Sequence, residues 1–226
     1  RTADQLKAEA HRLVAAATAV DPARLSPIEK KRRAYLIGQS NAAAIRLDMA
    51  GGKHLPFQEE ALALFGAKPE IKPLSYYDPI LAKISALAPG EGDLSDRVEA
   101  FYARYNIPED RLDAVMRAAI AECRRRTAAH IALPSDEKFD LEFVKNKPWS
   151  GYNWYKGAGH SLIQVNTDLP VRIGRAVDLG CHEGYPGHHV LNLLNEEKLT
   201  KGRGWIEFTI NPLYGPQSLI SEGSAN

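Results

Sequence analysis

The sequence has little of three features that would classify it at once. Its two cysteines, Cys123 and Cys181, are too few for a disulfide framework, and they either pair or remain two buried free thiols. No apolar run approaches the ~20 residues that a membrane-spanning helix needs, so we expect no membrane span. The formal net charge is only +1, so no overall field favours nucleic acid or an anionic membrane surface. These features argue against a disulfide scaffold, an integral membrane protein and a nucleic-acid-binding protein.

What is present is typical of a globular protein. The chain has 226 residues, of which 44% are hydrophobic and 25% charged, enough for one large domain or two small ones. Because the first residue is Arg1 rather than Met, the lack of a leader leaves both a cytoplasmic and a secreted location open. Residues 221–226 read as the first turns of a helix without a stop signal, so we expect a chain truncated at its C-terminus.

Residues 1–135 have a helical pattern throughout. Apolar residues recur near the 3.6-residue period, and Ser26-Pro27-Ile28-Glu29 is a capping box with proline at the first helical position. Gly51-Gly52 should end the helix that begins there. The pattern predicts helices over residues 3–20, 27–49, 57–65, 77–87, 94–105 and 109–129.

Residues 136–226 have a different pattern. Alternating apolar residues predict a strand over 138–144, and Ser161 to Val165 predicts a second one, which is either a peptide-pairing edge strand or an internal strand. From Pro170 a helix should lead into a histidine cluster. We therefore expect a mainly α-helical α+β fold, with a helical scaffold over 1–135 and a small sheet with site helices over 136–226. The two regions together should form one continuous domain.

The histidine cluster reads Cys-His-Glu-Gly-Tyr-Pro-Gly-His-His over residues 181–189. In the common H-E-x-x-H zinc motif, two histidines four residues apart share one helix face and the glutamate activates water. Here the residue four after His182 is Pro186, and the next histidine is His188. Two residues six apart on a straight helix are ~9 Å apart along its axis and point to different faces. A metal site therefore requires a bend or bulge at Pro186-Gly187.

A zinc site of this kind needs a third protein ligand and one open position. Glu222 is the candidate, and Asn226 lies four residues later, on the same face of a helix. The Asn226 carbonyl would accept a hydrogen bond from His182 and fix the tautomer of its ring.

These motifs resemble a known family. Glu222-x-x-Ala225-Asn226 is similar to the third-ligand helix of the gluzincin metallopeptidases, and the stretch from about Leu141 to Asn226 looks like an uncharacterised bacterial family of that superfamily. The matching segments are Pro-Trp-Ser-Gly-Tyr-Asn-Trp-Tyr (148–155), Val-Asn-Thr-Asp-Leu-Pro (165–170), His-Glu-Gly-Tyr-Pro-Gly-His-His (182–189) and Glu-Gly-Ser-Ala-Asn (222–226). The resemblance implies a zincin-like architecture with the small sheet beside the site helix.

The resemblance also implies roles. His182, His188 and Glu222 would bind Zn²⁺, and Glu183 would be the general base that activates metal-bound water to cleave a peptide bond. Since the family motif centres on the histidine directly after Pro-Gly, we favour His188 over His189, which would be a hydrogen-bonded neighbour together with Asn226. The candidate substrate-binding residues are Tyr152, Trp154, Tyr155 and Asn166.

The expected substrate is a peptide or a small amide. Two alternatives stay open: a metal-dependent hydrolase of a non-peptide amide or ester, and a non-catalytic protein that retains the fold. The oligomeric state is not encoded in any pattern that we can identify.

Overall fold

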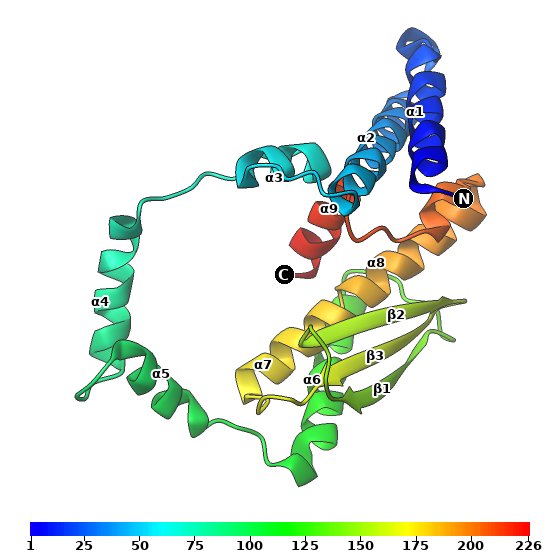
Figure 1. Ribbon diagram of the computed structural model, residues 1–226. Coiled ribbons are helices and arrows are strands. Elements are labelled where there is room, and N and C mark those ends of the chain that lie inside the picture. Colours follow the sequence, from blue (N-terminus) through cyan, green and yellow to red (C-terminus); the bar gives the residue numbers. More distant parts are fainter. The chain divides into compact units, whose positions relative to one another are not determined.

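The computed structural model describes all 226 residues, and Figure 1 labels its helices and strands. The chain divides into two compact units. The first unit comprises Arg1–Ile71 and Ile210–Gly223, and the second comprises Lys72–Thr209 and Ser224–Asn226. Residue 135, where the sequence changes from a helical to a strand pattern, lies within the second unit.

The first unit is helical. The capping box predicted at its second helix is present, since Glu29 accepts a hydrogen bond from the Ser26 backbone N–H at 2.9 Å, and that helix ends at Gly51. The hairpin of the first two helices is the main contact of the unit, and the Arg33 guanidinium ties it by donating to the Ala17 and Thr18 carbonyls. The helices are α1 (Ala3–Ala19), α2 (Pro27–Ala50) and α3 (Phe57–Phe65), and most of α9 (Pro216–Ala225) also belongs here.

The second unit contains the remaining helices and the sheet. Its helices confirm the predicted ones to within a few residues, except that a short 3-10 turn, Glu109–Arg111, precedes the long helix. No helix in the structure is long and apolar enough to cross a membrane. The helices are α4 (Asp78–Leu87), α5 (Leu94–Ala103), α6 (Leu112–Ala128), α7 (Ile173–Leu179) and α8 (His188–Leu194).

The sheet has three strands in the order β1-β3-β2. These are β1 (Lys138–Val144), β2 (Gly151–Gly157) and β3 (His160–Asn166). β1 is parallel to β3, and β2 is antiparallel to it. The predicted strands at 138–144 and 161–165 are confirmed, and β3 is internal, so its interpretation as an edge strand is wrong. β2 is an edge strand instead.

One face of the sheet carries the core of the second unit. Buried residues alternate along β3, and Ser161, Ile163 and Val165 all point to this face. Ile163 packs with Ile120 of α6 and with Tyr185, while Val165 packs with residues of α6 and α7. The mainly α-helical α+β class is therefore confirmed, and the segment that bears the histidines is part of this core.

Candidate metal centre

The chain from α7 to α8 does not run as one straight helix. After α7, residues Gly180–Gly184 form a π-helical turn, Tyr185 is extended, the Tyr185–Pro186 peptide is cis, and α8 begins at His188. The Gly187 N–H donates to the Cys181 carbonyl at 3.1 Å. A Cβ at Gly187 would lie 1.7 Å from the His182 carbonyl oxygen, so only glycine fits this close approach. The predicted break at Pro186-Gly187 is confirmed.

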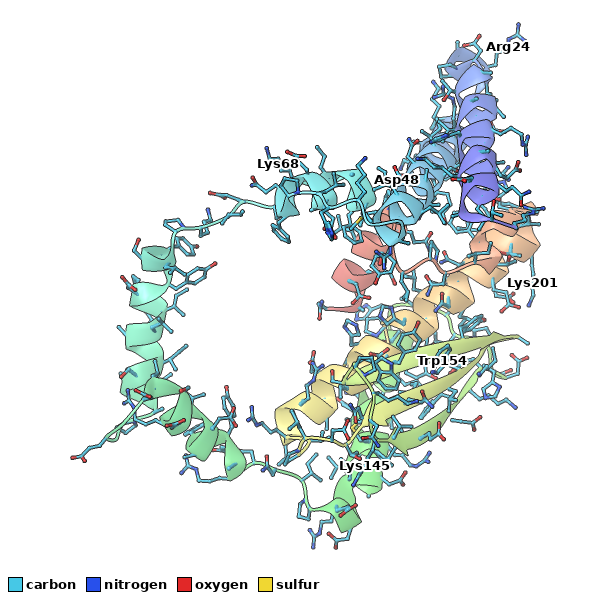
Figure 2. All side chains as sticks on the ribbon, in the orientation of Figure 1. Arg24, Asp48, Lys68, Lys145, Trp154 and Lys201 are labelled. Atoms are coloured by element: carbon cyan, nitrogen blue, oxygen red, sulfur yellow. A yellow bond between two sulfur atoms is a disulfide. The ribbon has the colours of Figure 1, made fainter.

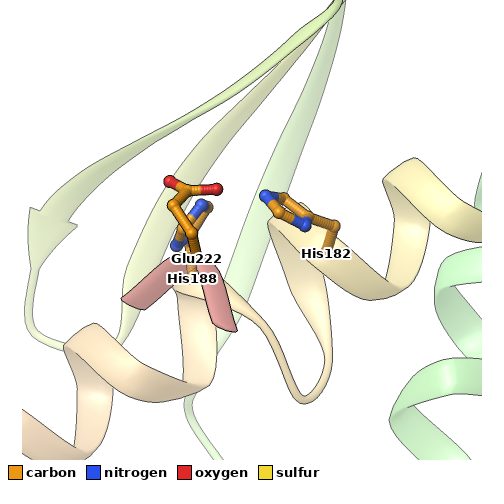
Figure 3. A group of neighbouring side chains, drawn as sticks. All are labelled: His182, His188 and Glu222. Atoms are coloured by element: carbon orange, nitrogen blue, oxygen red, sulfur yellow. The ribbon is translucent and has the colours of Figure 1, made fainter. Parts of the chain in front are cut away.

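This path places two histidines together. The rings of His182 and His188 lie with their centroids 4.7 Å apart and their planes nearly perpendicular. Figure 3 shows that the two imidazoles and the Glu222 carboxylate point toward one another. One ligand atom from each of these three side chains lies within 4.8 Å of the other two. The three residues predicted as metal ligands thus form one cluster, which we call the His-His-Glu cluster.

Asn226 holds one ring of this cluster. His182 Nδ1 is 3.3 Å from Asn226 Oδ1, and both residues belong to the second unit. Because the amide oxygen only accepts hydrogen bonds, this contact places the ring proton on Nδ1 and leaves Nε2 as the lone-pair donor. The contact expected from the Glu222-x-x-x-Asn226 spacing is therefore present.

Glu183 is buried next to His182 and is held by β2. Asn153 of β2 donates from Nδ2 to the Glu183 carbonyl at 2.6 Å. A Cβ on Gly151 would lie 3.0 Å from Glu183 Oε1 and 2.6 Å from a methyl of Leu179, so the bare backbone of β2 packs on the carboxylate. Asn153 is a residue that the sequence did not single out, since it lies within an aromatic segment that we did not predict to be a strand.

The aromatic residues predicted to bind substrate lie elsewhere. Gly151 and Asn153 face Glu183, so their neighbours Tyr152 and Trp154 point to the opposite face of the sheet. There the rings of Tyr152 and Trp154 lie at a tilt with their centroids 4.5 Å apart, and Trp154 donates to Gln164. Figure 2 labels Trp154 on the sheet. The structure does not bring these two residues to the His-His-Glu cluster.

The other two candidates have structural partners. The Tyr155 hydroxyl donates a hydrogen bond to Glu196. Burial raises the pKa of Tyr155, and the hydrogen bond to Glu196 raises it as well. Asn166 donates to the carbonyls of Lys147 and Trp149 and so closes the loop between β1 and β2. Both side chains therefore have partners in the framework around the sheet.

Cys123 and Cys181 form a disulfide. Of the two alternatives that the sequence left open, pairing is therefore observed. The bond joins α6 to the residue immediately before His182, so the segment that bears the histidines is covalently attached to the core helix.

His189 is not part of the cluster. It is fully buried, with Nδ1 2.8 Å from Ser161 Oγ and Nε2 2.9 Å from Glu137 Oε2. Burial lowers the pKa of His189 and favours its neutral form, although the Glu137 carboxylate opposes this shift. The prediction that His189 is a hydrogen-bonded residue rather than a ligand agrees with this geometry.

Glu137 is the centre of a buried polar network. Its carboxylate accepts hydrogen bonds from Arg124 at 2.7 Å, from Tyr185 and from His189. Burial by itself would raise the pKa of Glu137, but the bonds from Tyr185, Arg124 and His189 outweigh it and the pKa is lowered. Nothing in the local sequence marks Glu137, because its partners come from segments distant in the chain.

Comparisons with known proteins give a fold but no family. No family model matches the chain, and no curated protein matches it. Among solved structures, the chain is similar to one described as "the putative lipoprotein from Colwellia psychrerythraea", with 16% sequence identity and a TM-score of 0.52. The match covers 96% of this chain and 43% of that one. The chain thus spans less than half the length of a protein whose fold it shares.

Proposed function

We propose that the protein is a zinc-dependent hydrolase of the gluzincin type that cleaves peptide bonds. The observation that carries this proposal is the convergence of His182, His188 and Glu222, with Glu183 adjacent to the first ligand. The path through Gly187 brings together two histidines that a straight helix would keep apart.

The donor set fits zinc. Two imidazoles and one carboxylate are a known ligand set of catalytic zinc sites, which keep a fourth position open. Bonds of about 2.0–2.1 Å place tetrahedral ligand atoms ~3.4 Å apart. The observed limit of 4.8 Å is within reach of that spacing by small side-chain rotations.

The residues around the cluster have separable roles. Bound zinc would lower the pKa of a water molecule to ~7 and polarise the substrate carbonyl. Glu183 would accept a proton from the attacking water and return it to the leaving amine, as a carboxylate held beside the reacting atoms can do. Asn153 would hold the Glu183 main chain, and Asn226 would keep His182 in the tautomer that presents Nε2.

β2 offers a place for an extended substrate. It pairs with β3 along one side only and no strand of the sheet pairs with its other side, which is where an extended peptide would add. Gly151 and Asn153 of the same strand contact Glu183, so a peptide paired there would run past the general base. This edge replaces the one that the sequence suggested at 161–165.

The test is a pair of substitutions in the zinc-loaded protein. Glu183→Gln should retain about one equivalent of zinc and lose hydrolysis by at least ~100-fold, the usual scale for a general base. His182→Ala should lose the zinc, whereas His160→Ala should keep it, because His160 contacts Asp140 rather than the cluster.

Metal content by elemental analysis and a panel of peptide, amide and ester substrates give the readouts. A fully active Glu183→Gln variant would refute the general base. Stoichiometric zinc in His182→Ala would refute the site. Activity on esters but on no peptide would refute the proposed peptidase activity and favour a hydrolase of non-peptide substrates.

A further inference from the structure

We propose that Glu137 is a positioning residue for the metal site, which holds both ends of the turn that presents His188. This inference rests on the proposed zinc site and adds a residue to it.

The two donors from the site segment lie on either side of the Pro186-Gly187 turn. Tyr185 precedes the turn and His189 follows it, and both donate to the same oxygen, Oε2 of Glu137. The other oxygen accepts from Arg124 of α6. One carboxylate therefore fixes the start and the end of the turn relative to the core helix.

His189 transmits this constraint to His188. Both ring nitrogens of His189 are bonded, one to Ser161 and the other to Glu137, so the ring has a single orientation. Consecutive residues on a helix point ~100° apart. With His189 fixed inward at the start of α8, His188 is directed sideways toward His182.

Ser161, His189 and Glu137 do not form a catalytic triad, although the residue types would allow one. Ser161 and His189 are both 0% exposed, so no substrate can reach the hydroxyl. The order of contacts is also inverted, since the serine bonds Nδ1 and the acid bonds Nε2. The network is therefore a scaffold, and its role is to position the residues attached to it.

A carboxylate is a costly choice for packing alone. Burying a charge is unfavourable unless every lone pair is matched, and an apolar side chain of similar volume often stabilises a core equally well. What the carboxylate adds is geometry, because its two oxygens fix three donors in defined directions. Metal ligands need such definition, and changing residues outside the ligand set typically weakens metal binding 10–100-fold.

The experiment measures zinc dissociation constants by competition with a chelator of known affinity. Glu137→Gln should weaken zinc binding about 10-fold or more, because the amide cannot accept from Arg124 and from Tyr185 and His189 together. Glu142→Gln is the matched control, because Glu142 is exposed on β1 and contacts Gln164. The zinc affinity of this variant should equal that of the unaltered chain. With Co²⁺ in place of zinc, Glu137→Gln should also change the visible absorption spectrum, and excess zinc should restore its hydrolysis.

A second variant covers the case in which Glu137→Gln does not fold. Tyr185→Phe removes the hydroxyl that bonds Glu137 and keeps the ring, and should weaken zinc binding by a few-fold. If Glu137→Gln lowers only the unfolding midpoint while its zinc affinity and cobalt spectrum match the unaltered chain, the inference is wrong. An unchanged zinc affinity in Tyr185→Phe overturns it as well. If the unaltered chain itself binds no zinc, the proposed function fails, and this result is distinct from either variant outcome.

Discussion

The turn from Tyr185 to His189 separates two polar regions of different kinds. On one side lies the His-His-Glu cluster, whose histidines are half-buried and whose glutamate is exposed. On the other lies the buried network of Glu137, in which His189 has no exposed surface. His188 and His189 are adjacent and chemically identical, so only the direction of each side chain distinguishes them.

This difference shows how one short segment serves two purposes. The buried network uses its hydrogen bonds to define a conformation, so its loss should appear in the free energy of unfolding. The cluster has three ligand atoms that converge on one point, so its loss should appear in metal binding. Substitutions on the two sides should therefore have different primary effects.

The largest effect should come from the turn itself, which both regions share. Gly187→Ala places a methyl group 1.7 Å from the His182 carbonyl oxygen, so the turn must move. We expect loss of zinc and a decrease in the free energy of unfolding of about 3 kcal/mol, at the upper end for overpacking. Gly184→Ala is the control, because its Cβ would meet Ile120 at an ordinary 3.7 Å and should be tolerated. Chemical unfolding and metal analysis measure both quantities, and a Gly187→Ala variant with normal zinc content would contradict the account.

The two adjacent histidines give the next largest contrast. In metal-free protein, His189→Ala should lower the free energy of unfolding by about 2–4 kcal/mol. The reason is that buried Glu137 and Ser161 each lose a hydrogen bond to the His189 ring. His188→Ala should change it by less than ~1 kcal/mol, but should lose zinc when metal is supplied. Urea unfolding with chelator present measures the first quantity. Equal destabilisation by the two variants would remove the distinction between the regions.

Gly151 tests the contact between β2 and Glu183, the proposed general base. Gly151→Ala would put a Cβ 3.0 Å from Glu183 Oε1, so we expect zinc to be retained and kcat to fall about 10–100-fold, as small misplacements of reacting groups do. Gly174→Ala on α7 is the control, since nothing lies within 4 Å of its Cβ position. Steady-state kinetics on the zinc-loaded proteins provide the measurement, and unchanged kcat in Gly151→Ala would separate β2 from catalysis.

The smallest expected effect is the pH dependence of the network. The pKa of Glu137 is lowered in the folded protein, so its ionised form contributes stability above the unfolded pKa of ~4.3, and this contribution is lost as pH falls through the folded pKa. The difference in unfolding free energy between the unaltered chain and Glu137→Gln should therefore shrink on acidification, by on the order of 1 kcal/mol between about pH 6 and 3.

An exposed carboxylate provides the comparison for this titration. Hydrogen bonds from Arg125 and Arg126 lower the pKa of Glu122 to about 2, but Glu122 lies on the surface of α6, where solvent screens the interaction. Glu122→Gln should leave the unfolding midpoint unchanged at pH 7. A Glu137→Gln difference that stays constant with pH would show that the buried carboxylate is not ionised.

Local signals made most helices predictable. Ser26 and Glu29 mark where α2 begins and Gly51 marks where it ends, because caps act through neighbouring backbone groups. β1 and β3 were predictable because Phe139 and Leu141, and likewise Ile163 and Val165, alternate with polar residues. β2 was missed because its Tyr-Asn-Trp-Tyr run does not alternate, and its strand conformation depends on pairing with β3.

The candidate site likewise has features with a local sequence signal and features that depend on distant segments. The six-residue spacing of His182 and His188 predicted the requirement for a bend, because that relation is local. Glu222 is distant from both histidines in the chain, and it was predicted from its four-residue spacing to Asn226 together with the family resemblance. The Glu137 network was not predictable, because its members converge only after the sheet and α6 pack together. The pairing of Cys123 with Cys181, 58 residues apart, could not be decided from two cysteines alone.

The most direct test of the account is to locate the metal. Crystals grown with zinc, measured on both sides of the zinc absorption edge, should show one strong anomalous peak within about 2.0–2.2 Å of His182 Nε2, a His188 ring nitrogen and a Glu222 oxygen. The His189 ring should show no peak and should remain bonded to Glu137. An anomalous peak at His189 would contradict the central claim. The claim would also be contradicted if the protein contains no zinc after loading and the cluster shows no peak.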